Sequence, residues 1–197
     1  LNSGGANCYT GAEGFQVSHK SAELVATALD LSAQDVLVCS TGLIGTQLDT
    51  SKLYPGIDAA RQALSSDGGA DSARAIMTTD SVPKLATATS KAGWKIGGMA
   101  KGAGMLAPAL ATMLVVITTD AEVSDLDAHL RAATAVSFDR LDSDGCTSTN
   151  DTVILMASGA SGVRAEAEEF QNLLVDVCMD LALSLIHISE PTRQAEI

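Results

Sequence analysis

Thr112 is the residue of this sequence whose type and setting could make it a nucleophile. A threonine hydroxyl needs a base, and the free α-amine of an N-terminal threonine can supply one. That amine has an ordinary pKa of about 8, which suits a base near neutral pH. The chemistry requires cleavage between Ala111 and Thr112, and the nearby glycines in KGAG (101–104) permit strained backbone. The alternative is that Thr112 only begins a strand.

The run CSTGLIG (39–45) could stabilise negative charge. It follows a short apolar stretch and supplies Thr41, Gly42 and Gly45 at a predicted turn. Backbone N–H groups at such a turn can point at an anion or an oxyanion. Many strand ends share this pattern, so it is a weak indication by itself.

The run RLDSDGCTSTND (140–151) is similar in part to a calcium-binding loop. Asp142 and Asp144 occupy two ligand positions, but Arg140 stands where a carboxylate is needed and Asp151 replaces a glutamate. A turn rich in Asp, Gly and Ser/Thr is the better interpretation, and we expect no metal. His19 and His129 fall in or beside predicted helices, where solvated histidines are commoner than catalytic ones.

Composition excludes several classes of protein. The 197 residues carry 24 acidic and 12 basic side chains, a net charge of −12 that would repel nucleic acid. The longest uncharged run near Thr112 is a poor membrane span. The four cysteines show no metal or disulfide spacing, and no signal peptide opens the chain, so we expect a cytoplasmic protein. With 3% aromatic residues, the predicted core is aliphatic.

Strands and helices must alternate to position these residues. Apolar periodicity predicts helices over 19–31, 55–65, 121–137 and 163–185, and strands over 35–41, 75–80, 94–102, 112–120 and 151–158. This alternation indicates an α/β or layered α+β fold.

Six runs in a fixed order carry a family resemblance, which covers roughly residues 2–183. The runs are NCYTGAEGFQ, CSTGLIG, IMTTDSVPK, KIGGMAKGAGM, KGAGMLAPALATMLVVITTDA and DSDGCTSTNDTVILMASG. Together they resemble the ornithine acetyltransferase (glutamate N-acetyltransferase) family of arginine biosynthesis.

The resemblance implies self-cleavage between Ala111 and Thr112, with Thr112 as nucleophile. Its hydroxyl would take the acetyl group from N-acetylornithine and pass it to glutamate, without a cofactor, although some members also use acetyl-CoA as a co-substrate. The family's oxyanion hole falls on Thr41 and Gly42, and its substrate contacts fall on Thr78, Lys101 and Thr112. Lys101 would supply a cation for a substrate carboxylate.

The resemblance also implies a layered sandwich with mixed sheets, N-terminal-nucleophile-like, in an α2β2 assembly. Residues 1–111 would belong to the α chain and 112–185 to the β chain of one catalytic domain. Residues 186–197 look foreign to the family, so Glu190 is assigned no role, and family regions on both sides are expected to be missing. Two alternatives stay open: an N-terminal-nucleophile aminopeptidase, and an inactive truncated fragment.

Overall fold

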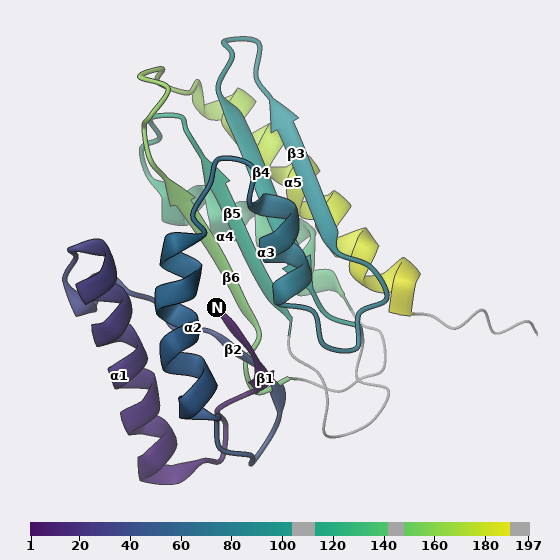
Figure 1. Ribbon diagram of the computed structural model, residues 1–197. Coiled ribbons are helices and arrows are strands. Elements are labelled where there is room, and N and C mark those ends of the chain that lie inside the picture. The colour runs from purple at the N-terminus through teal and green to yellow at the C-terminus, as the bar shows by residue number, and fades with distance from the viewer. Residues whose placement is uncertain (104–112, 142–147, 190–197) are drawn as a thin grey trace, which may run out of the picture.

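A four-stranded mixed sheet forms the centre of the molecule (Figure 1). The computed structural model describes residues 1–103, 113–141 and 148–189. The strand order is β3-β4-β5-β6, with β3 (Lys84–Thr89), β4 (Lys95–Lys101), β5 (Leu114–Thr119) and β6 (Thr152–Ala157). Antiparallel ladders join β3 to β4 and β4 to β5, and a parallel ladder joins β5 to β6. The strand β5 lies inside the sheet, as its continuous β-branched run favours.

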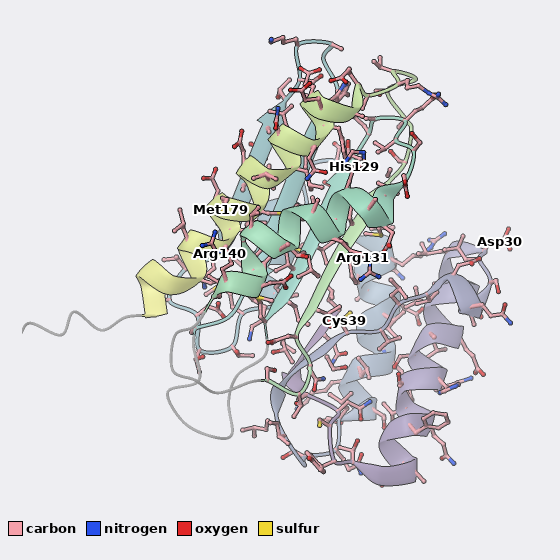
Figure 2. The ribbon with its side chains drawn as sticks, turned by 180° about the vertical axis from the view of Figure 1, so that it is seen from behind. Asp30, Cys39, His129, Arg131, Arg140 and Met179 are labelled. Atoms are coloured by element: carbon pink, nitrogen blue, oxygen red, sulfur yellow. The ribbon has the colours of Figure 1, made fainter. Side chains whose placement is uncertain are left out.

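Two helices cover one face of this sheet, as Figure 2 shows from behind. They are α4 (Leu126–Val136) and the longer α5 (Ala167–Ser189), which packs on β3 and β4. The short helix α3 (Gly69–Ala75) lies on the opposite side in Figure 1 and also contacts β3 and β4. The buried core fills the space between the sheet and α5, and it contains Leu174, Val177 and Leu181.

The N-terminal part of the chain forms a second layer beside the sheet. Here β1 (Asn2–Gly5) pairs in parallel with β2 (Ser40–Leu43), and α1 (Gly11–Leu29) packs along α2 (Thr50–Gln62). Two 3₁₀ turns, Ala33–Asp35 and Phe138–Arg140, complete the described elements. Asp30, in the left-handed conformation, ends α1, and the Asp49 carboxylate caps the start of α2 by accepting from the Ser51 N–H.

The predicted α/β class with a mixed sheet and flanking helices is confirmed. The strands predicted over 94–102, 112–120 and 151–158 appear as β4, β5 and β6, and the helix predicted over 163–185 appears as α5. The finer description as N-terminal-nucleophile-like stays a prediction.

Two strand predictions were wrong. Of the segment 35–41 only Ser40 and Thr41 lie in a strand, and Leu37 is 65% exposed, so this apolar run is not a buried strand. The segment 75–80 begins in the last residue of α3, and its Ile76 and Met77 N–H groups donate to helix carbonyls. Helical hydrogen bonding therefore replaced the strand that the apolar residues suggested.

The prediction of an aliphatic core was also wrong in one respect. Trp94 and Phe170 are both fully buried with ring centroids 5.7 Å apart, and Phe138 joins the same cluster. The chain has only six aromatic residues, but half of them lie in the buried core. A large ring buried there removes more apolar surface from water than a small aliphatic side chain does.

Candidate active site

Three of the residues singled out in the sequence meet in one hydrogen-bonded cluster. Lys101, the last residue of β4, donates from Nζ to Thr41 Oγ1 at 3.0 Å and to Thr78 Oγ1 at 2.7 Å. Thr41 lies in β2 and Thr78 in the loop after α3, so three separate segments converge on one ammonium group. Thr41 and Lys101 are buried whereas Thr78 is exposed, so the described cluster meets solvent at Thr78.

Asp80 and Lys84 complete this cluster, and the sequence analysis did not single them out. One carboxylate oxygen of Asp80 accepts from Lys84 Nζ at 2.5 Å and from the Gly102 N–H at 2.7 Å. The other accepts from the Thr78 N–H at 3.2 Å and lies 3.8 Å from Lys101 Nζ. The sequence feature that could have indicated this pair is an acidic and a basic residue four positions apart within IMTTDSVPK. This run is one of those that carried the family resemblance.

Burial and hydrogen bonding act in opposite directions on these charges. Burial lowers the pKa of the Lys101 ammonium, and attraction to Asp80 offsets part of this effect. Burial alone would raise the pKa of the Asp80 carboxyl. The hydrogen bonds from Lys84 and from the Gly102 N–H outweigh it, so this pKa lies below its ordinary value. Asp80 is therefore a carboxylate at neutral pH.

Gly42 lies beside Thr41 in β2 and closely approaches Gly4 of β1. Its φ of +132° disfavours any other residue, and an added Cβ would lie 2.6 Å from the carbonyl carbon of Gly4. Gly4 and Gly42 are register partners in the parallel pair. Glycine at this position is thus required for the two strands to pair as they do.

Ala111 and Thr112 lie outside the described residues. The described chain resumes at Met113, whose N–H donates to Asp151 Oδ1 at 2.8 Å and whose carbonyl accepts from the Thr152 N–H at 2.9 Å. A Cβ added to Gly102 would lie 3.7 Å from the Met113 Cα. The residue that follows Thr112 in the sequence is therefore held next to the end of β4.

Asn150 links the N-terminal layer to the same end of the sheet. Its side-chain nitrogen donates to the carbonyls of Ala6 at 2.6 Å and Ser40 at 3.3 Å. Because Ser40 precedes Thr41 in β2, this side chain helps to hold β2 against the loop that leads into β6.

The other candidate chemistry has no support in the described residues. His129 lies on α4 (Figure 2), where it bonds to Gln171 at 2.7 Å and packs edge-on against Phe170, which is a structural role. His19 bonds to the Phe15 carbonyl. Asp142 and Asp144 of the calcium-loop interpretation lie outside the described ranges, as does Glu190. Within those ranges no group of acidic, histidine or cysteine side chains gathers as metal ligands, and no helix could cross a membrane.

A separate groove of about 730 Å³ lies between α1, α2 and β1. Its lining is largely apolar and includes Val25, Leu53 and Ile57, and none of Thr41, Thr78 or Lys101 contributes to it. The groove thus lies apart from the polar cluster, and the candidate active site rests on the hydrogen-bonded residues.

Comparison with known proteins now identifies the family. The model of the ArgJ family matches residues 1–195. This chain belongs to the ArgJ family. Curated ArgJ relatives include the arginine biosynthesis bifunctional proteins ArgJ of Thermobifida fusca (strain YX), 57% identical over 197 residues, and of Streptomyces avermitilis, 58% identical over 192 residues.

The chain spans about half the length of the curated relatives it matches. It aligns over 99% of its own length with 51% of the Thermobifida protein, and over 96% with 50% of the Streptomyces protein. A solved structure, the arginine biosynthesis bifunctional protein argJ of Bacillus halodurans, is 31% identical with a TM-score of 0.47, covering 54% of this chain and 58% of that one.

Proposed function

We propose that a complete protein containing this chain transfers an acetyl group from N-acetylornithine to glutamate. The observation that carries the proposal is the Lys101 ammonium, which donates to the hydroxyls of Thr41 and Thr78. These are three of the residues on which the family resemblance places the oxyanion hole and the substrate contacts. Membership of the ArgJ family and relatives named for arginine biosynthesis support the same assignment.

The proposed reaction begins with hydrolysis of the peptide bond between Ala111 and Thr112, which creates an N-terminal threonine. The Thr112 hydroxyl then attacks the acetyl carbonyl of N-acetylornithine while the α-amine accepts its proton. Backbone N–H groups at Thr41 and Gly42 stabilise the oxyanion. The amide C–N bond breaks, ornithine leaves with a proton from the amine, and an acetyl ester remains on Thr112.

The second half of the proposed reaction reverses the first with another amine. The α-amine of glutamate attacks the acetyl ester, the ester C–O bond breaks, and the hydroxyl of Thr112 regains its proton. Lys101 and Thr78 hold the substrate carboxylate throughout. No cofactor takes part, and acetyl-CoA serves as an alternative acetyl donor in some members of the resembled family. We place this reaction in the cytoplasm and in an α2β2 assembly.

Substitution of Thr112 tests the proposal. In a complete protein carrying this sequence, Thr112→Ala abolishes both self-cleavage and acetyl transfer, whereas Thr112→Ser keeps both because a hydroxyl remains. Mass spectrometry reads the cleavage, and ornithine release from N-acetylornithine with glutamate as acceptor reads the transfer. A folded wild-type protein that stays uncut and releases no ornithine contradicts the proposal.

Two other outcomes of the same assay identify the alternatives. Peptide hydrolysis without acetyl exchange would indicate an aminopeptidase with an N-terminal nucleophile. Soluble protein with neither activity in the 197-residue chain, beside an active complete protein, would mean that this piece alone is inactive.

A further inference from the structure

Among the described side chains, the buried cluster around Asp80 holds two ammonium groups and one carboxylate. The side chains of Asp80, Lys84 and Lys101 are 0%, 1% and 2% exposed, so two ammonium groups and one carboxylate share one buried site. An unbalanced charge away from water is costly unless it is paired. The net charge of +1 on these three described side chains favours an anion that enters from outside.

The geometry decides which lysine neutralises Asp80. Lys84 Nζ lies 2.5 Å from the carboxylate, within hydrogen-bond distance, whereas Lys101 Nζ lies 3.8 Å from it, beyond that distance. Both carboxylate oxygens are also held by backbone N–H groups, one from Gly102 and one from Thr78. Asp80 is thus oriented toward Lys84, and its contact with Lys101 stays long.

The hydrogen bonds of Lys101 go to hydroxyl groups instead. Its described partners at hydrogen-bond distance are Thr41 and Thr78, which are neutral. Asp151 also attracts Lys101, but it is exposed to solvent and accepts from the Met113 N–H. Among the described side chains, the nearest carboxylate is therefore Asp80, an ion-pair partner at 3.8 Å, and the hydrogen bonds of the Lys101 ammonium go to the two hydroxyls.

We propose that Lys84 is a positioning residue that occupies Asp80 and so keeps the Lys101 ammonium available for a substrate carboxylate. This inference rests on the proposed function, because it deepens the role of Lys101 in that site. A carboxylate bound to Lys101 brings the buried cluster to two positive and two negative charges. Thr78, the exposed member, lies where such a carboxylate would enter.

The β-ladder explains how Lys84 acts without contacting the substrate. Lys84 is the first residue of β3 and is the register partner of Ala100, which directly precedes Lys101 in β4. The two lysines therefore come from neighbouring strands at one end of the sheet, and Asp80 lies between their ammonium groups. Removing the charge of Lys84 leaves Lys101 as the only described cation close to Asp80.

Lys84→Met tests this role in a complete protein carrying the sequence. Asp80 then pairs with Lys101, and KM for N-acetylornithine and glutamate rises about tenfold or more, the equivalent of one charged hydrogen bond. The value of kcat changes much less, because Thr112, Thr41 and Gly42 are untouched. Lys95→Met is the matched control: it removes one ammonium from the exposed start of β4, and KM stays at the wild-type value.

A double variant separates this role from a merely structural one. In Asp80→Asn/Lys84→Met no carboxylate competes for Lys101, so KM returns toward the wild-type value although two buried groups have changed. A structural role predicts the opposite, with the double variant at least as impaired as the single. Lys84→Arg, which keeps the cation, leaves KM closer to wild type than Lys84→Met does.

The role of Lys84 and the proposed function can fail separately in these assays. An unchanged KM in Lys84→Met, or a double variant without recovery, overturns the role of Lys84 while the wild-type acetyl transfer still supports the proposed function. A wild-type protein without acetyl transfer overturns the proposed function itself. If Lys84→Met fails to fold, Lys84→Gln keeps a hydrogen bond to Asp80 without the charge and is expected to show the same rise in KM.

Discussion

Gly42 shows how strongly a single residue determines the geometry of the site. Its φ of +132° and the 2.6 Å that would separate a Cβ from the Gly4 carbonyl carbon both exclude a side chain. We expect Gly42→Ala to lower the free energy of unfolding by about 1–3 kcal/mol through backbone strain, because residues other than glycine rarely adopt such a φ. Displacement of β1 adds a further loss of about 1–3 kcal/mol. Urea unfolding followed by circular dichroism measures the total.

Gly45 provides the control for this substitution. It also has a positive φ, +78°, but an added Cβ would meet nothing within 4 Å. Gly45→Ala therefore carries the strain alone and costs about 1–2 kcal/mol. Equal losses for the two variants would show that the contact between β1 and β2 at Gly42 is not tight.

At the scale of single residues, the sequence predicts the two hydroxyls and the ammonium group of the site. It misses the buried ion pair that lies beside them. Thr41, Thr78 and Lys101 were identified because ordered motifs resemble a known family, and the structure brings them together. Asp80 and Lys84 are charged, and from sequence alone charged residues are expected to be exposed to solvent. Only the topology buries them, since it brings the loop after α3 against the ends of β3 and β4.

Among the elements, β4 and α5 depend on one close approach. Gly98 of β4 faces α5, and a Cβ there would lie 2.8 Å from Leu181 Cδ1 and 3.3 Å from Val177 Cγ1. We expect Gly98→Ala to lower the free energy of unfolding by about 1–3 kcal/mol, because buried Leu181 must leave its position in the core. Thermal or urea unfolding of the variant tests this.

The neighbouring glycine is a matched control on the same strand. An added Cβ at Gly97 would meet nothing within 4 Å, so Gly97→Ala is expected to be neutral or to stabilise by about 0.4–1 kcal/mol, since it restricts the unfolded chain. The double variant Gly98→Ala/Leu181→Ala should lose less than the sum of its two single changes. Strict additivity would mean that the two side chains do not compete for space.

Elements were predictable where the hydrophobic pattern coincides with burial. The β-branched run of β5 is covered by neighbouring strands and by the core, so its pattern and its environment agree. The run at 35–41 has the same apolar character, but Leu37 is exposed and only Ser40 and Thr41 find a strand partner, in β1. The pairing of β1 with β2 depends on two glycine-containing segments that carry no periodic signal.

At the scale of the whole molecule, the central sheet is built from strands on both sides of the proposed cleavage site. The strand β4 precedes the bond between 111 and 112 and β5 follows it, yet six consecutive residue pairs join them, from Ile96↔Thr119 to Lys101↔Leu114. The core is shared in the same way, because Trp94 and Ile96 come from before the bond, and Phe170 and Leu174 from after it. Neither piece could bury its apolar residues without the other.

We therefore expect the two proposed chains to remain one folded unit after cleavage. Native mass spectrometry of the cleaved protein should give only species that hold equal numbers of both chains, at twice their summed mass for the proposed α2β2 assembly, and denaturing conditions should give two separate chains. Because they share one core, chain separation and loss of helical circular dichroism should occur at the same urea concentration. The Thr112→Ala variant gives only the uncut chain under denaturing conditions. Separation of the chains well below the unfolding transition would show that β4–β5 pairing and the shared core do not hold them together.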